Sequence, residues 1–490
     1  MSAPHKDDGD DAPEMLDAED ALEEIQDVEG DIAMDSDDDE PEEITLQNDS
    51  IAYFDAHKDS VFAIAQHPTQ PSLIATGGSE GEGDDAPGKG YVFDTSPVVG
   101  RPVLPPSYNA DPSSQQQKST ELKPLFTIEG HSDSINTLAF TLPNGQFLVS
   151  GGLDGRLRTY ELSVDARNKP SFAFLAESQE VPEVNWLAPC PSPKYPNTIA
   201  LGASDGSVWV YTIDPSDSAN PMQIVQSYFL HTASCTAGSW SPDGTFLATV
   251  SEDSSLCVWD VWGEAAAKNL VNDNGQTVVS LTGQDQRFGV EGGLYAVAVD
   301  PKSTFVAVGG AGGSIKIVGL PRVGADSQPA SSKQSKTKAK GGEAGSAQGG
   351  TILADLQTQS DGIETLSFSS KQPLLAAGSV DGSIAVYDTS RRFALRRHIK
   401  EAHEEFSVVK VEFVAGLGDG WLLTSCGMDG VVRRWDVRGA ASSAVTSLVK
   451  EWRGHRGDGE GGGVLGFVQG TTGERIVTAG DDGVVLVFEA

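Results

Sequence analysis

The residues from Phe246 to Asp260 set a pattern of hydrophobic and polar positions that returns along the chain. An apolar run rich in β-branched side chains is followed by a polar turn at Asp253 and Ser254, and then by a second alternating run that ends in Trp259 and Asp260. Two such runs around a tight turn predict two antiparallel strands joined in a hairpin.

The hairpin recurs with a fixed spacing between its turn carboxylate and an aromatic residue six positions later. Chance does not maintain this spacing in six hairpins. Two further copies are irregular: one has Gly312 and Gly313 at the turn with Val318 in the aromatic position, and one ends at residues 91–94. The six regular pairs are Asp154 and Tyr160, Asp205 and Tyr211, Asp253 and Trp259, Asp381 and Tyr387, Asp429 and Trp435, and Asp482 and Phe488.

Most hairpins are preceded by a further apolar strand, as at residues 61–65, 135–140 and 408–413. Three inner strands and one outer linking strand per repeat describe a blade of a β-propeller. Eight copies therefore predict an all-β fold, an eight-bladed β-propeller. The expected blades are His57–Asp94, Pro124–Glu161, Phe172–Asp214, Met222–Val261, Val278–Leu320, Thr351–Asp388, Ala394–Asp436 and Val445–Phe488.

Two kinds of dipeptide make residues 51–490 resemble the WD-repeat family: Trp-Asp at 259–260 and 435–436, and Gly-His at 130–131 and 454–455. The resemblance implies that a His, a Ser or Thr, the turn Asp and the Trp form a buried hydrogen-bonded set in each blade. Two sets match fully and a third nearly so: His231, Thr249, Asp253 and Trp259; His403, Ser425, Asp429 and Trp435; and His131, Ser150, Asp154 and Tyr160.

Blades three and six depart from this pattern. No His precedes their first strands, and Leu201 and Ala377 replace the hydroxyl residue, so Asp205 and Asp381 lack the partners that the family provides. An unpaired buried carboxylate is costly. Either these carboxylates face solvent, or backbone amides cap them.

The first 43 residues are rich in Asp and Glu and poor in aromatic residues. Burial cannot offset the entropy of ordering such a segment, so we expect a disordered acidic tail at 1–43 and a propeller at 44–490. The tail is either a solubilising segment or an attractant for a cationic client. Part of residues 44–54 is expected to supply the outer strand of the last blade and thereby close the ring.

Two loop insertions interrupt the propeller pattern, at residues 96–120 and 324–350. The first is rich in Pro, Ser and Gln, and the second is of low complexity and contains four lysines. A solvated linker, a nuclear localisation signal and an intramolecular mimic of a cationic client are all open for the second insertion. Its lysines are Lys333, Lys336, Lys338 and Lys340.

Net charge narrows the class of partner. The chain carries −37, of which residues 1–50 contribute −20 through 21 acidic residues and one Lys, so the remainder carries −17. A polyanion bound through Lys and Arg is therefore an unsuitable direct ligand, which argues against nucleic acid. A basic protein or peptide is the expected partner.

Acidic residues recur just before the first strand of a blade and at the second-to-third-strand turns, which in a propeller share one rim. Like charges that converge on a rim create a field that a cationic segment relieves, although a solvated rim also needs polar groups. Trp186 and Trp240 are candidate aromatic anchors. The predicted client-binding residues are Asp59, Asp133, Glu183, Asp205, Glu252, Glu291, Asp361, Asp381, Glu405 and Glu460.

Nothing in the sequence favours catalysis. Five of the eight histidines precede a first strand, where they have a structural position, and no nucleophile, phosphate-loop or metal-ligand spacing occurs. We expect no enzymatic activity, no cofactor and no metal. The four cysteines are expected to be reduced core residues, and no apolar run approaches the ~18 residues that span a bilayer. We therefore expect a monomeric cytoplasmic protein without a membrane partner, with the nucleus as a second location.

Three segments go beyond the general WD pattern: the acidic tail followed by 51–64, the run 201–209, and the ending 479–489. They resemble the angio-associated migratory cell protein family, whose fungal branch is a dedicated chaperone of the large-subunit ribosomal protein called L-ten in eukaryotes and L-sixteen in bacteria. The resemblance implies capture of the basic N-terminal segment of that newly made protein and its delivery to the pre-60S particle.

Two other functions remain open at this point. A general WD-repeat scaffold, such as a ubiquitin-ligase substrate receptor, would use the side of the propeller as well as its rim. A histone chaperone would use the same acidity for a different cationic partner. The identity of the proteins that copurify with the chain separates the three.

Overall fold

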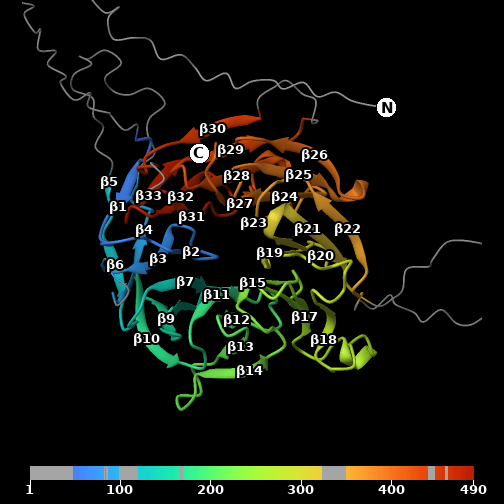
Figure 1. Cartoon of the computed structure of the whole chain (residues 1–490). Coiled ribbons are helices and arrows are strands. Elements are labelled where there is room, and N and C mark those ends of the chain that lie inside the picture. Colours follow the sequence, from blue (N-terminus) through green and yellow to red (C-terminus); the bar gives the residue numbers. More distant parts are fainter. Residues whose placement is uncertain are drawn as a thin grey trace, which may run out of the picture. The chain divides into compact units, whose positions relative to one another are not determined.

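The repeats fold into eight β-sheets that follow one another around a common axis, as Figure 1 shows for this computed structural model. The structure describes residues 48–81, 83, 86–98, 120–165, 169–322, 349–439, 447–457 and 462–490. In this part of the chain the helices are single 3-10 turns, at Ala266–Lys268, Ala311–Gly313, Thr389–Arg391 and Gly418–Gly420. The prediction of an all-β, eight-bladed propeller is confirmed.

The first four blades are antiparallel four-stranded sheets whose strands run in chain order from the innermost to the outermost. Blade one consists of β2 (Ala63–Gln66), β3 (Leu73–Ser79), β4 (Gly88–Asp94) and β6 (Pro124–Ile128). Blade two consists of β7 (Ile135–Phe140), β8 (Phe147–Gly152), β9 (Leu157–Val164) and β10 (Pro170–Ser178). Blade three consists of β11 (Val184–Pro189), β12 (Thr198–Ala203), β13 (Val208–Ile213) and β14 (Met222–Tyr228). Blade four consists of β15 (Cys235–Trp240), β16 (Phe246–Ser251), β17 (Leu256–Asp260) and β18 (Thr277–Leu281).

The other four blades continue this order, and the last one has a fifth strand. Blade five consists of β19 (Leu294–Val299), β20 (Phe305–Gly310), β21 (Ser314–Gly319) and β22 (Ile352–Gln357). Blade six consists of β23 (Ile363–Phe368), β24 (Leu374–Ser379), β25 (Ile384–Asp388) and β26 (Ala394–Ile399). Blade seven consists of β27 (Val408–Phe413), β28 (Leu422–Gly427), β29 (Val432–Asp436) and β30 (Leu448–Trp452). Blade eight consists of β31 (Val464–Val468), β32 (Arg475–Gly480), β33 (Val485–Glu489), β1 (Ala52–Phe54) and β5 (Thr120–Glu121).

The sequence repeat is offset from the structural blade by one strand. The expected blade two began at Pro124, but Pro124–Ile128 is β6 and pairs with β4 as the outer strand of blade one. The same offset applies to β14, which begins the expected blade four and closes blade three. Each apolar segment ahead of a His therefore completes the preceding sheet.

The ring closes through a strand from the beginning of the chain. β1 pairs antiparallel with β33, with Ala52 opposite Val487 and Phe54 opposite Val485. This confirms the prediction that part of residues 44–54 supplies the outer strand of the last blade. The end of the first insertion adds an unexpected fifth strand, because β5 pairs in parallel with β1. Most of both insertions and all of the acidic tail lie outside the described residues.

Buried side chains lie between neighbouring blades. In one cluster, Val208 and Val210 of blade three pack with Leu247, Cys257 and Trp259 of blade four. All four cysteines are free and buried. One apolar residue at or just before the start of the innermost strand is fully buried in every blade, which fixes that strand against its neighbour. These residues are Val61, Ile135, Val184, Cys235, Leu294, Ile363, Val408 and Val464.

No helix in the part of the chain that the structure describes is both long and apolar enough to cross a membrane.

Candidate functional site

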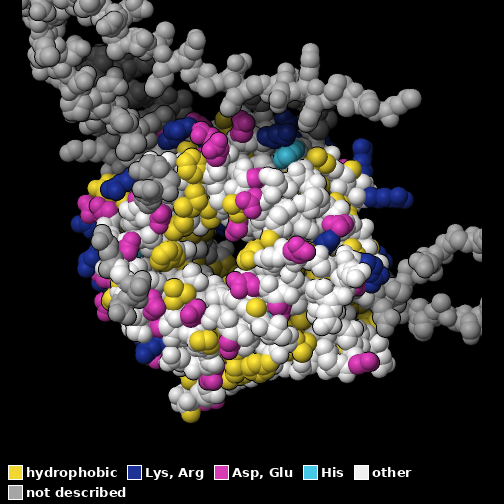
Figure 2. Space-filling view, in the orientation of Figure 1, with side chains coloured by type: hydrophobic (Ala, Val, Ile, Leu, Met, Phe, Trp, Pro, Cys, Tyr) yellow, Lys and Arg dark blue, Asp and Glu magenta, His cyan; other side chains and the backbone are white. Residues whose placement is uncertain are grey.

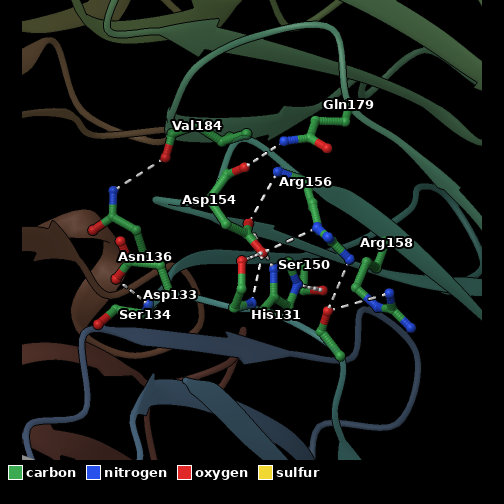
Figure 3. A network of polar contacts seen from close by, with 12 residues as sticks. His131, Asp133, Ser134, Asn136, Ser150, Asp154, Arg156, Arg158, Gln179 and Val184 are labelled. Carbon is green, nitrogen blue, oxygen red and sulfur yellow. Dashed lines mark hydrogen bonds and ion pairs between the residues drawn. The ribbon is translucent and has the colours of Figure 1, made fainter. Parts of the chain in front are cut away.

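Buried hydrogen-bonded sets hold the turn of several blades in place. In blade two, His131 lies between Ser150 and Asp154, at 2.8 Å from the Ser Oγ and 3.1 Å from the Asp Oδ1 (Figure 3). Asp154 also accepts the backbone N–H groups of Ser132 and Arg156. Both oxygen atoms of the Asp154 carboxylate thereby accept hydrogen bonds within the fold.

The two sets expected to match the family pattern are both present, with one difference. In blade seven, His403 bonds to Ser425 and Asp429 at 2.7 and 2.8 Å, and Arg433 also pairs with the Asp. In blade four, His231 bonds to Thr249 at 2.8 Å but reaches the Oγ of Ser255 instead of Asp253. Asp253 there caps the backbone N–H of Thr232 at 2.6 Å.

Burial keeps His231 uncharged, because desolvation lowers its pKa from 6.5 to about 4. The unfolded chain binds a proton near pH 6.5 and the folded chain only near pH 4, so stability falls as the pH drops through this range. From pH 7.5 to pH 5 this one residue costs about 2 kcal/mol of unfolding free energy. Urea unfolding at both pH values measures the loss of unfolding free energy between them. This loss should be smaller in His231→Gln than in the parent, by about 2 kcal/mol. An equal loss in variant and parent would contradict the assignment.

Blade six supports that substitution, because Gln359 already occupies the position of the His there. Its Nε2 donates to the carbonyl oxygen of Ser383 at 2.8 Å. Blade three has Glu180 at the same position, and this side chain is exposed. Blades three and six, which lack a His at this position, therefore hold their turns by other means.

The turn carboxylates of these two blades are capped by N–H groups of their own loops. Asp381 accepts the backbone N–H groups of Ser360 and Ser383, at 2.7 and 2.9 Å. Burial alone would raise its pKa, but these hydrogen bonds lower the pKa to about 2. Asp205 accepts from the N–H and the hydroxyl of Ser207 through Oδ1. The alternative of backbone capping therefore holds for both, while Asp205 is also exposed.

One backbone hydrogen bond per blade joins the loop before the innermost strand to the second-to-third-strand turn. In blade three, for example, the N–H of Ser204 donates to the carbonyl of Glu183. The two groups of loops that were expected to share one rim are therefore in contact in every blade. The other seven donors and acceptors are Ser79 and Ser60, Leu153 and Ser134, Glu252 and Ser234, Ala311 and Gly293, Val380 and Gly362, Met428 and Ser407, and Asp481 and Gly463.

Side chains at the start of the inner strands join successive blades along this rim. Asn136 donates to the carbonyls of Val184 and Asn185, as Figure 3 shows for Val184. Asn185 in turn donates to the carbonyl of Cys235 at 2.9 Å, and Thr236 to that of Leu294 at 2.6 Å. These contacts fix the spacing between the loops of blades two to five.

Nine of the ten predicted client-binding residues lie in these loops and turns, and Glu460 lies outside the described residues. Among the described residues, none of the nine forms an ion pair with Lys, Arg or His, so their charge is not neutralised within the fold. Asp59, Asp133 and Asp381 are half-buried. The exposed ones are Glu183, Asp205, Glu252, Glu291, Asp361 and Glu405.

The acidic residues before the inner strands do not occupy one equivalent position. Asp59, Asp133 and Asp361 stand two residues before the buried strand start, and each caps the next backbone N–H, at 2.6 to 2.8 Å. Glu183 stands one residue before, and Glu291 and Glu405 three. The carboxylates are therefore staggered around the ring. Figure 2 shows acidic side chains spread over one end of it, with Lys and Arg mostly towards the outer edge.

Of the two predicted aromatic anchors, Trp240 is buried and Trp186 is half-buried. Trp240 is 7% exposed, and its indole N–H donates to the carbonyl of Ala188. Trp186 is wedged between blades three and four: a Cβ at Gly202 or Gly238 would lie within 2.3 Å of its ring. Trp240 is thus a core residue, and Trp186 fills the space that two glycines leave.

The structure exposes two other aromatic rings in the rim loops. Phe62 directly follows the buried Val61 and is 41% exposed, and Phe229 is 65% exposed. A sequence signal for Phe229 exists: it stands two residues before His231, where most other blades have a polar residue. No group of three or more His, Cys, Asp or Glu residues in the described ranges could hold a metal ion.

Eight blades, five of which hold a buried His bonded to a Ser or Thr, define a WD-repeat β-propeller. The family model described as "WD domain, G-beta repeat" matches residues 122–161, 222–260 and 350–388. A solved structure of Chaetomium thermophilum Sqt1 bound to the N-terminus of the ribosomal protein L10 is 63% identical, covers 91% of this chain and 100% of that chain, and has a TM-score of 0.78. The chain belongs to the Sqt1 family.

More distant relatives agree with this family. The ribosome assembly protein SQT1 of Saccharomyces cerevisiae is 29% identical, and the match covers 94% of this chain and 93% of the relative. The human angio-associated migratory cell protein is 24% identical over 90% of this chain and 80% of the relative. Neither relative's name describes an enzyme.

Proposed function

We propose that this protein is a ribosome-assembly chaperone that binds the basic N-terminal segment of a large-subunit ribosomal protein, the counterpart of L10. Support comes from the 63% identical Sqt1 whose solved structure contains the N-terminus of L10. The client is then delivered to the pre-60S particle, a step that the name of the yeast relative, a ribosome assembly protein, supports. The chaperone acts as a monomer, without enzymatic activity or a cofactor, in the cytoplasm and also in the nucleus.

The loops before the innermost strands and the second-to-third-strand turns, together called the acidic rim, are the binding surface in this proposal. The single observation that carries it is the set of nine carboxylates in the rim loops that have no cationic partner among the described residues. A cationic segment that docks there gains charge-assisted hydrogen bonds, which offset part of the cost of ordering it. The tail at residues 1–43 is proposed to be a separate acidic segment ahead of the propeller.

Binding through these carboxylates should depend steeply on salt. Interactions between exposed charges weaken as the Debye length shortens, from about 14 Å at 50 mM to about 6 Å at 300 mM salt. We expect the Kd for an L10 N-terminal peptide to rise about tenfold over this range. Fluorescence anisotropy with the full chain measures it. A Kd that does not change with salt would exclude the rim as an electrostatic site.

Affinity purification from dividing cells identifies the class of client. The proposal expects a large-subunit ribosomal protein together with assembly factors. Recovery of ubiquitin-ligase subunits or of histones in their place would instead support the scaffold or the histone-chaperone function.

A further inference from the structure

The acidic rim has one gap, at the loop that enters blade four. Residues 229–234 between β14 and β15 contain no acidic and no basic residue except the buried His231. Phe229, in this loop, is 65% exposed, the highest value for a large hydrophobic side chain in the described part of the chain. An exposed aromatic ring thus lies in a rim loop that contributes no carboxylate.

The blade architecture does not require an aromatic residue at this position. Seven other blades have a residue two places before the position of the His, and six of these residues are polar or charged. The seventh, Phe288 in blade five, is fully buried and belongs to the core. The polar ones are Asp55, Glu129, Ser178, Gln357, Glu401 and Arg453. Phe229 is therefore exceptional in being both aromatic and exposed.

A chain of contacts connects Phe229 to the carboxylate of Asp205. The Phe229 and Trp209 rings meet edge to face, with centroids 5.8 Å apart and planes at 86°. The indole N–H of Trp209 donates to the Oγ of Ser207 at 3.0 Å, and this hydroxyl donates to Oδ1 of Asp205 at 2.6 Å. The aromatic ring and the carboxylate are therefore linked through two intervening side chains, Trp209 and Ser207.

Backbone packing holds the same two loops together. A Cβ on Gly206 would lie 2.5 Å from the carbonyl oxygen of Ala233, so the turn after Asp205 lies directly against the loop that carries Phe229. Both hydrogen bonds to Asp205 use Oδ1. Among the described residues nothing donates to Oδ2, which remains available to a partner.

We propose that Phe229 and Asp205 form an arginine subsite for the client segment, an inference that rests on the proposed function. A planar guanidinium can lie on an aromatic face and, through its fork of N–H donors, bind a carboxylate at the same time. A Lys ammonium offers no such plane. An apolar side chain could pack on the Phe229 ring but would leave the charge of Asp205 without a partner. The subsite therefore selects arginine at one position of the client.

Binding of a labelled L10 N-terminal peptide to the full-length chain tests the subsite. Phe229→Ala should raise the Kd roughly 5- to 30-fold, the range expected for a partly desolvated cation–π contact. Phe229→Tyr should bind like the parent. Phe229→Leu, which keeps apolar area without a π face, should lose nearly as much as the Ala variant, and parent-like binding by it would overturn the arginine assignment.

Asp205→Asn keeps an oxygen to cap Ser207 but removes the charge, and should weaken binding roughly 5-fold. If both groups hold one guanidinium, the double variant should lose less than the product of the single losses. Replacing each peptide Arg by Lys in turn should identify a single position whose effect disappears in Phe229→Ala. Independent losses, or no such position, would contradict a shared arginine.

Phe174→Ala is the matched control, because Phe174 is 52% exposed but lies on β10, the outer strand of blade two. It should leave the Kd within about twofold, since it removes no rim contact. If the parent protein does not bind the peptide, the proposed function fails. If the parent binds and Phe229→Ala binds equally well, only the subsite fails.

Discussion

Reversing two rim charges, Glu183→Lys together with Glu252→Lys, should weaken binding of the L10 N-terminal segment about 30- to 100-fold at low salt. Both side chains are exposed, and neither makes a hydrogen bond or ion pair in the described structure, so their replacement does not disturb the blades. Each reversal replaces an attraction by a repulsion. The two effects of one reversal together cost about 1 kcal/mol of binding free energy, and more where docking excludes water.

The matched control replaces two acidic residues by Lys at the opposite end of the ring. Asp273 lies in the loop between β17 and β18, and Glu474 lies between β31 and β32, away from the rim turns. Asp273→Lys with Glu474→Lys should change the affinity less than threefold, because only the net charge differs. Anisotropy titrations of both double variants at 50 mM salt measure the contrast. Equal losses would mean that net charge, and not the rim, attracts the client.

Removing the side chain that anchors the closing strand should have the largest effect on stability. Phe54 of β1 is 1% exposed, stacks on Phe93 at 4.8 Å and meets the edge of Tyr91. Phe54→Ala should lower the free energy of unfolding by about 3–5 kcal/mol, because it leaves a cavity at the seam of the ring. Urea unfolding followed by tryptophan fluorescence measures this loss.

Phe62→Ala provides the control for that experiment, since the same chemical change occurs on a ring that is 41% exposed. Its expected cost is below about 1 kcal/mol. A small loss in Phe54→Ala would show that β1 does not secure the seam and that the other contacts of blade eight suffice.

The blade architecture was predictable because the chain repeats one local rule. Apolar alternation, a tight turn and a spacing of six residues to an aromatic recur often enough to define each sheet without knowledge of the whole. The assignment of outer strands to blades was wrong by one step, since a strand such as β6 pairs with the sheet before it and not with the hairpin that follows it. Pairing across a loop is set by the ring, which no single repeat encodes.

The candidate site was predictable in charge but not in detail. The loops that carry the carboxylates follow from the strand order, so their common location could be inferred. The exposure of individual side chains could not be inferred. Trp240 and Phe229 are both aromatic residues near strand ends, yet Trp240 is 7% exposed and Phe229 is 65% exposed. Only the three-dimensional packing tells which ring turns inward. The capping of Asp381 likewise depends on Ser360, 21 residues away.

The pairing of β1 with β33 joins two strands that are translated far apart in time. Ala52 opposes Val487, so the seam cannot form until the ribosome has translated both strands. Contacts of such sequence separation are slow to find one another. Until β33 has been made the ring stays open, and the rim loops beside the seam acquire their final geometry only once that strand pairs with β1.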